Sequence, residues 1–264
     1  MADSLFSVAE QVVLVSGGSR GIGKAIAAGF AERDAHVIIT GRDEQVLIEA
    51  AMEISLGAHA VKPFVCDVAD SDEVRHLVQE TLNQFGKIDT LVNCAGVNRR
   101  KPSDTLTEDD YDFVMDINLK GAFLLSQLVG AAMVKRQSGC QINIASLNSD
   151  RPLTNVLPYA MSKAGMAHMT KALAMEWGEH GVRVNALAPG FILTDLTEKL
   201  WSDPGMQQWG KANTPQRRLG KPEDMVGTAL FLASPASAFM TGQVLYVDGG
   251  FTAGWQWPIP PNNQ

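Results

Sequence analysis

One stretch near the start of the chain limits the possible folds more than any other. Residues 12–15 form a short apolar run, the segment 16–23 reads SGGSRGIG, and a helical pattern extends from about residue 22 to 33. A glycine-rich loop between a buried strand and a helix lets the backbone approach a pyrophosphate and places that anion at the positive helix N-terminus. The stretch therefore predicts a dinucleotide-binding fold, with an ordinary glycine-rich turn as the alternative.

Six further short apolar runs alternate with helical patterns along the rest of the chain. Such alternation is typical of a doubly wound α/β domain built on a parallel sheet. No repeat, low-complexity tract or linker interrupts it, so we expect residues 1–264 to form a single Rossmann-type domain with seven parallel strands flanked by helices. The six further expected strands are residues 36–40, 60–66, 89–92, 141–145, 182–187 and 243–247.

Two segments stand outside this alternation. Residues 195–216 follow no regular pattern and carry Trp201 and Trp209 among charged residues; the family resemblance given below implies that they form a lid over the substrate. Residues 252–264 form a proline-rich C-terminal tail that includes Trp255 and Trp257. We expect this tail to cross onto a neighbouring subunit or to fold over its own pocket.

The composition excludes several classes of function. The chain has 22 lysines and arginines against 29 aspartates and glutamates, a net charge of −7, and no basic run, so nucleic-acid binding is not expected. It has neither the apolar core of a signal peptide nor an apolar run of membrane-spanning length. Its three cysteines are far apart and its five histidines show no ligand spacing. We therefore expect free buried thiols, no bound metal and a reducing, cytoplasmic location.

The end of the second expected strand indicates the cofactor. A dinucleotide fold that selects NAD usually has Asp or Glu there to bind the ribose 2′-hydroxyl, whereas this chain has Gly41 and Arg42, with Arg20 in the glycine loop. Two guanidinium groups can bind a 2′-phosphate through paired hydrogen bonds, so we expect NADP. NAD stays the alternative, because a shifted register would bring Asp43 to the ribose. Asp67, after the third expected strand, either binds the adenine amino group or caps the next helix.

Tyr159 and Lys163 are four residues apart in a helical pattern, so their side chains share a helix face. An ammonium group beside a phenol lowers the phenol pKa, which allows the phenol to exchange a proton near neutral pH. Ser146, at the end of the fifth expected strand, would place its hydroxyl beside the phenol and hold a substrate oxygen. Taken alone, a Tyr-x-x-x-Lys pair also occurs as ordinary neighbours on a surface helix.

Together these features have the order and spacing of the short-chain dehydrogenase/reductase family, which the chain resembles from about residue 5 to 251. The chain departs from the family pattern at Cys94, where a second asparagine is more usual, and we expect a local change without loss of function. The markers are Gly17, Gly21, Gly23, the segment Asn93-Cys94-Ala95-Gly96, Asn118, Ser146, Tyr159, Lys163, Pro189-Gly190 and Asp248-Gly249-Gly250.

The resemblance implies a role for each residue of the site. Tyr159 would be the general acid/base, Ser146 would stabilise the reacting oxygen, and Lys163 would lower the phenol pKa and hold the nicotinamide ribose. Asn118 would keep its helix kinked and position a water that links Lys163 to solvent. The residues implied to contact the cofactor are Gly17, Ser19, Arg20, Gly21, Ile22, Gly23, Arg42, Asp67, Val68, Asn93, Ala95, Gly96, Tyr159, Lys163, Pro189, Gly190, Ile192 and Thr194.

The loops after the fourth and fifth expected strands indicate the substrate. They carry Arg99, Asn148 and Arg151, which we expect to contact the substrate together with Ser146 and Tyr159. Arginine pairs with carboxylates and amides recognise hydroxyls, so a sugar acid or polyol fits. The Asn-Arg-Arg of residues 98–100 also resembles the gluconate and deoxygluconate dehydrogenases of the family. The alternative, with equal weight, is that these residues are solvated charges of surface loops without a role in binding.

Two other functions stay open. A 3-oxoacyl-thioester reductase of fatty-acid type would use the tryptophans of the last quarter to wall an apolar pocket. A non-catalytic NADP-binding sensor or scaffold is opposed by the presence of all four catalytic residues. The resemblance further implies a homo-oligomer, a tetramer or a dimer, and the apolar, methionine-rich helix that follows Tyr159 suits a subunit interface.

Overall fold

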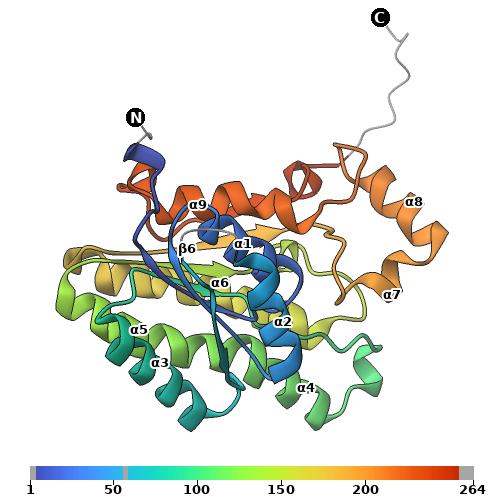
Figure 1. Cartoon of the computed structure of the whole chain (residues 1–264). Helices are drawn as coiled ribbons and strands as arrows, with labels where there is room; N and C mark the ends of the chain where they lie inside the picture. Colours follow the sequence, from blue (N-terminus) through green and yellow to red (C-terminus); the bar gives the residue numbers. More distant parts are fainter. Residues whose placement is uncertain (1–3, 56–58, 256–264) are drawn as a thin grey trace, which may run out of the picture.

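The computed structural model describes residues 4–55 and 59–255, within which seven strands form one sheet (Figure 1). Each apolar run identified in the sequence contains one of these strands. The strands are β1 (Val12–Ser16), β2 (His36–Gly41), β3 (Lys62–Val65), β4 (Thr90–Asn93), β5 (Gly139–Ile144), β6 (Val182–Pro189) and β7 (Val244–Val247).

All neighbouring strands are parallel, in the order β3-β2-β1-β4-β5-β6-β7. The predicted doubly wound parallel sheet is therefore confirmed. The chain builds outward from β1 to β3 and then returns to place β4 on the other side of β1, with Ser16 opposite Asn93. In open α/β sheets ligands bind beyond the carboxyl ends of the strands at such a switch point, so the topology places a crevice between β1 and β4.

Helices cover both faces of the sheet (Figure 1). Val13 and Val15 of β1 join a core with α1, α2 and α9, whereas Val12 and Leu14 join a second core with α3, α5 and α6. Burial on both faces explains why inner strands such as β1 are continuous apolar runs. The helices are α1 (Gly21–Ala31), α2 (Glu44–Ile54), α3 (Ser71–Phe85), α4 (Glu108–Met115), α5 (Gly121–Arg136), α6 (Leu157–Trp177), α7 (Glu198–Trp201), α8 (Pro204–Asn213) and α9 (Val226–Ala233).

A π-helical turn, η3 (Asp116–Lys120), joins α4 to α5. The combined helix, Glu108–Arg136, is long and apolar enough to cross a membrane by length and composition, with a mean hydropathy of 1.4, although we expected no such run. Half of its most apolar window is buried, and Leu125 and Val129 lie in the core beneath the sheet. Core packing therefore accounts for the apolar composition of this helix.

Two expectations about individual segments need correction. Asp67 does not cap α3: its carboxylate accepts the N–H of Ala69, and the capping carboxylate belongs to Asp70. Residues 195–216 are not irregular but contain α7 and α8, of which α8 is capped by Asp203. We predicted that the C-terminal tail, residues 252–264, contacts a neighbouring subunit or its own pocket. Most of this tail, residues 256–264 with Trp257, lies outside the described residues.

Candidate active site

A cleft of about 1000 Å³ opens at the carboxyl ends of β1, β4 and β5, where the topology places the crevice. It gathers residues that are far apart in the sequence, from the glycine loop to the segment after β6. Of the residues predicted to contact the cofactor, all except Asn93 line it, and Ser146 lines it as well. Residues that line the cleft without having been predicted include Cys94, Val97, Ile117, Leu196 and Thr197.

The glycine loop lies close to the start of the loop after β4. Gly17 has a φ of +67°, and a Cβ built on it would lie 2.7 Å from the Ala95 Cα. Only glycine meets both conditions, because a side chain would be strained by the backbone angle and would collide with backbone atoms. This close approach brings the start of α1 to the floor of the cleft.

The start of α1 differs from the starts of the neighbouring helices. Side chains cap α2, α3 and α4, namely those of Asp43, Asp70 and Thr107. The cap residue of α1 is Arg20, and its side chain makes no capping hydrogen bond. The first N–H groups of α1 are thus left without a side-chain acceptor at the lining of the cleft. This arrangement is suited to an anion such as a pyrophosphate.

The far end of the cleft is cationic. Arg20 and Arg42 both line it with exposed side chains, and the Arg42 Nη1 lies 3.8 Å from the Asp67 Oδ2. Asp43 also lines the cleft, but its Oδ1 accepts the N–H of Val46 at 3.1 Å and thereby caps α2. A carboxylate engaged in this way is a poor ligand for a ribose hydroxyl. The two guanidinium groups are a suitable site for a phosphate.

The three residues at the inner end of the cleft come from two elements. Ser146 follows β5, and Tyr159 and Lys163 lie on the first turns of α6. The Lys163 Nζ is buried, donates to the Ile144 carbonyl at 2.6 Å, and lies 5.7 Å from the centre of the Tyr159 ring. The Ser146 hydroxyl acts to lower the pKa of the phenol. Phenol, hydroxyl and ammonium therefore face the same end of the cleft.

The two titratable groups of this set have shifted pKa values. Burial raises the pKa of the Tyr159 phenol, and the Ser146 hydrogen bond and the Arg100 charge act in the opposite direction. Burial lowers the pKa of the Lys163 ammonium to about 8. We expected the charge of Lys163 to lower the pKa of the Tyr159 phenol. In this arrangement the charge that lowers this pKa is that of Arg100. A phenol of raised pKa keeps its proton at neutral pH and is suited to donate it.

Asn118 lies in the π-helical turn η3, the irregular helix segment that we expected there. Its Oδ1 accepts the Val97 N–H at 2.8 Å, and its Nδ2 donates to the Val97 carbonyl at 3.0 Å and to the Ser162 Oγ at 3.1 Å. A Cβ built on Gly96 would lie 3.5 Å from the Asn118 Oδ1 and 3.7 Å from the Lys163 Nζ. Asn118 thus ties the loop after β4 to the helix that carries the lysine.

Asn93 was predicted to contact the cofactor, and its side chain does not line the cleft. It is buried in the core, where its Nδ2 donates to the Ser126 Oγ at 2.9 Å and to the Asn143 Oδ1 at 2.8 Å. The Asn143 Nδ2 in turn donates to the Thr170 Oγ1 at 2.9 Å. This buried polar chain joins β4 and β5 to helices α5 and α6, and so supports the floor of the cleft.

The predicted substrate residues outside Ser146 and Tyr159 are engaged elsewhere and do not line the cleft. Asn148 is buried; its backbone N–H and its amide both donate to the Ser146 Oγ, at 3.1 and 3.3 Å, so it positions that hydroxyl. The Arg99 guanidinium lies 4.1 Å from the centre of the Phe113 ring and 3.7 Å from the Asp110 carboxylate. Arg151 lies 3.9 Å from Asp150.

Arg100 is the cation that the sequence analysis passed over within the same loop. Its neighbours Arg99 and Lys101 both pair with Asp110, whereas Arg100 is exposed and has no ion pair within the described residues. Its charge acts to lower the pKa of the Tyr159 phenol, while Arg100, like Arg99, is not among the residues that line the cleft. The sequence holds no signal that separates it from Arg99, because the difference depends on where Asp110 lies.

The tryptophans that could have walled an apolar pocket pack elsewhere. Trp201 is buried against Phe191, which also meets Trp209 and Phe251 edge to face, with ring centres 4.7–5.5 Å apart. Trp255 is 85% exposed. None of these tryptophans lines the cleft. The aromatic residues of the last quarter therefore fix α7 and α8 on the body of the domain.

Comparison with known proteins places the chain among nicotinamide-dependent enzymes. The family model described as enoyl-(acyl carrier protein) reductase matches residues 17–252. A gluconate 5-dehydrogenase of Gluconobacter oxydans is 38% identical over 248 residues, which cover 94% of this chain and 97% of the relative. A 3-oxoacyl-[acyl-carrier-protein] reductase of Thermotoga maritima is 38% identical over 240 residues, 91% of this chain and 97% of the relative.

Among solved structures, a gluconate 5-dehydrogenase from Burkholderia cenocepacia in complex with NADP and tartrate superimposes with a TM-score of 0.91. It is 37% identical, and the match covers 95% of this chain and 98% of that chain. The likeness thus extends over both the glycine loop and the segments around Tyr159, which together form the cleft.

Proposed function

Because the chain belongs to the short-chain dehydrogenase/reductase family, and is an NAD(P)-dependent alcohol dehydrogenase/ketone reductase, we propose that it interconverts a secondary alcohol and a ketone on a hydroxylated carboxylate of the sugar-acid type, with NADP. The observation that carries the choice of substrate is Arg100 in the loop after β4, an exposed guanidinium without an ion pair in the described part of the chain, whose charge acts to lower the pKa of the Tyr159 phenol. A carboxylate of the substrate would supply its partner.

Tyr159 exchanges the proton with the reacting oxygen in this proposal. In reduction the phenol, kept protonated by its raised pKa, donates to the oxygen as negative charge develops there. The Ser146 hydroxyl donates a second hydrogen bond to that oxygen; because its own oxygen already accepts from Asn148, its proton is free for the purpose. Oxidation uses the same groups in reverse.

Lys163 and Asn118 support the proton donor. The buried ammonium of Lys163 supplies positive charge beneath the cleft and is held by the Ile144 carbonyl. Asn118 fixes Val97 and lies across Gly96 from that ammonium, which leaves room between them for a water that returns the proton from solvent. A side chain at position 96 would fill this space.

NADP, when bound, supplies or accepts the hydride. The uncapped start of α1 receives the pyrophosphate, and Arg20 and Arg42 bind the 2′-phosphate. Asp43, the carboxylate that could have favoured NAD, is engaged in capping α2. The NADP seen in the Burkholderia cenocepacia structure supports this choice.

The second candidate is a 3-oxoacyl-thioester reductase, favoured by the Thermotoga maritima relative and by the description of the family model. Tartrate in the Burkholderia cenocepacia structure, a hydroxylated carboxylate, favours the sugar acid instead. Among the residues that the structure describes, no tryptophan lines the cleft to provide the aromatic wall expected for an acyl chain. Assembly as a homo-oligomer, tetramer or dimer, and a cytoplasmic location remain predictions.

A dehydrogenase screen tests the proposal. Gluconate and related sugar acids, neutral polyols, and an acetoacetyl thioester are offered with each cofactor, and reduced nicotinamide is followed by absorbance. We expect the highest kcat/KM for a sugar acid with NADP. Preference for the acetoacetyl thioester would favour the second candidate. Binding of NADP without turnover of any compound would favour a non-catalytic sensor or scaffold.

A further inference from the structure

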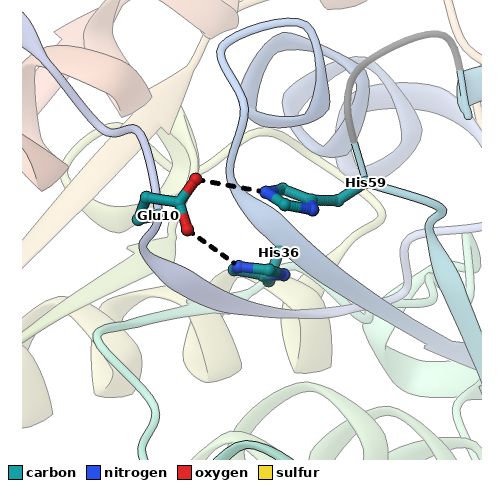
Figure 2. A group of neighbouring side chains, drawn as sticks. All are labelled: Glu10, His36 and His59. Carbon is teal, nitrogen blue, oxygen red and sulfur yellow. Dashed lines mark hydrogen bonds and ion pairs between the residues drawn. The ribbon is translucent and has the colours of Figure 1, made fainter.

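Three side chains with metal-ligating atoms meet at the end of the sheet where the strands begin, opposite the cleft (Figure 2). Glu10 precedes β1, His36 is the first residue of β2, and His59 precedes β3, so the fold brings together residues that the sequence separates widely. All three lie at the amino ends of parallel strands, whereas the cleft lies at the carboxyl ends. His36 and His59 thus meet in the fold although their positions in the sequence show no ligand spacing.

The donor atoms have a separation that suits one small cation. The His36 Nε2 lies 3.3 Å from one Glu10 carboxylate oxygen, and the His59 Nε2 lies 3.2 Å from the other. All three donor groups fall within 4.8 Å of one another. Two ligands at zinc-to-nitrogen distances of ~2.0–2.1 Å in a tetrahedral site are themselves about 3.3 Å apart, so little movement is needed to admit an ion.

The two imidazoles are already ordered relative to each other. Their rings stack, with centres 3.7 Å apart and planes 25° from parallel, and the Phe85 ring packs against His36 at 6.0 Å. Both Nε2 atoms point to the same side, toward Glu10, as Figure 2 shows. The fold therefore brings the ligands together before any ion binds, and one ring has to turn out of the stack so that both Nε2 lone pairs meet one ion.

Glu10 adopts a backbone conformation that is unusual for its type. Its φ is +60°, in the left-handed region that favours glycine, and its N–H donates to the Asp34 carbonyl at 2.9 Å. This conformation directs the carboxylate at the two imidazoles. The nearby cation Lys87 contacts the Glu10 carbonyl at 3.4 Å and pairs with Asp89 at 2.8 Å, a carboxylate that it shares with Arg136.

We propose that Glu10, His36 and His59 bind one divalent transition-metal ion of the zinc type. Two imidazoles and a carboxylate are ligands that zinc accepts, and the half-exposed position leaves a place for water as the fourth ligand. The ion would join the starts of the neighbouring strands β1, β2 and β3 and so stabilise this end of the sheet. The proposal does not depend on the proposed function, because the metal site lies at the amino ends of the strands and the cleft at their carboxyl ends.

Calorimetric titration of the full chain, free of any histidine tag, with Zn²⁺ tests the proposal. We expect one equivalent to bind to the wild type and to His76→Gln, a control for an exposed histidine on α3. In His36→Gln and His59→Gln the affinity falls by more than about tenfold, with dehydrogenase activity retained. Absence of binding to the wild type, or an equal loss in His76→Gln, overturns the proposal.

A measurement on the unaltered protein covers the case in which a variant does not fold. Histidines are modified with diethyl pyrocarbonate, with and without Zn²⁺, and located by peptide mass spectrometry. We expect Zn²⁺ to protect His36 and His59 while His76 stays reactive. Equal modification of His36 and His59 with and without the ion contradicts the site.

Discussion

The cleft has two halves that hold their ligands in different ways. The cofactor half, formed by residues 17–23, 41–43, 67–68 and 94–96, uses glycines, a helix start and backbone groups. The substrate half is lined by Val97, Ser146, Tyr159 and residues 195–197, and beside it lie the loops 98–101 and 147–155, in which internal pairing decides which side chains are free. Backbone geometry follows from local sequence, whereas the choice of a free side chain depends on contacts far along the chain. The first half was therefore predictable and the second was not.

Tyr159 lies where the two halves meet, and its loss gives the largest effect. In Tyr159→Phe we expect kcat to fall by about 10²–10⁴-fold, because the proton donor is removed. The affinity for NADPH should change little, since the ring remains. Stopped-flow turnover and fluorescence titration measure the two quantities. Tyr111→Phe, on the exposed side of α4, is the matched control and should behave as wild type. Near-normal turnover of Tyr159→Phe would assign the proton transfer to another group.

A glycine substitution tests the claim that backbone shape defines the cofactor half. In Gly17→Ala the new Cβ would lie 2.7 Å from the Ala95 Cα, so we expect NADPH affinity to fall by tenfold or more, roughly 1.4 kcal/mol. Gly86→Ala has a similar φ of +72° but nothing within 4 Å, so it should cost only about 1 kcal/mol of stability and no affinity. Equal NADPH affinities in the two variants would show that the close approach of Gly17 to Ala95 does not determine cofactor binding.

Lys163 should reveal a stability cost of the active site. Its pKa of about 8 in the folded state lies below the ordinary value of 10.5. The buried ammonium therefore destabilises the fold below pH 8, and this destabilisation fades as pH rises from 8 to 10.5. At pH 7, Lys163→Met should raise the free energy of unfolding by about 1–3 kcal/mol, the lower figure allowing for the lost bond to Ile144, and abolish turnover.

Urea unfolding at pH 7 and pH 10 checks this prediction, with Lys171→Met, an exposed lysine of the same helix, as the control. The gain in stability should be smaller at pH 10 and absent in the control. A Lys163→Met protein that is less stable at pH 7 would mean that the ammonium strengthens the fold.

The smallest expected effect concerns cofactor selection. The Arg42 side chain is exposed, so its contact with a 2′-phosphate is partly screened by solvent. We expect Arg42→Ala to raise the KM for NADP by about five- to tenfold and to leave the KM for NAD unchanged. Arg75→Ala, an exposed arginine on α3, serves as the control. An equal change in both KM values would indicate a general loss of structure at the cofactor half.

Particular residues explain what the sequence could and could not predict. The inner strands were identified because they are buried on both faces and are therefore apolar runs, as Val12 to Val15 illustrate, whereas the edge strands β3 and β7 are more exposed. Asn93 and Asn148 are asparagines beside the cleft, but their partners, Ser126 and Ser146, turn both amides inward. No local sequence pattern predicts these hydrogen bonds between side chains.

The same reasoning applies to the segment 195–216 and to the histidines. Helices α7 and α8 are short and form where Trp201 packs against Phe191, a contact between separate parts of the chain. His36 and His59 are 23 positions apart in the sequence, yet they stack because the parallel pairing of β2 and β3 aligns the starts of the two strands. Each of these features depends on contacts between residues that are distant in the sequence, and such contacts are difficult to predict from a single sequence.

One measurement tests the central claim about the substrate most directly. The ratio of kcat/KM for D-gluconate to that for D-sorbitol, a neutral polyol with the same number of carbons, is determined for the wild type, Arg100→Gln and Arg99→Gln. Because Arg100 is the unpaired cation near Tyr159, we predict that Arg100→Gln lowers this ratio by about ten- to a hundredfold while Arg99→Gln leaves it unchanged. An unaltered ratio in Arg100→Gln would contradict recognition of a substrate carboxylate by this residue.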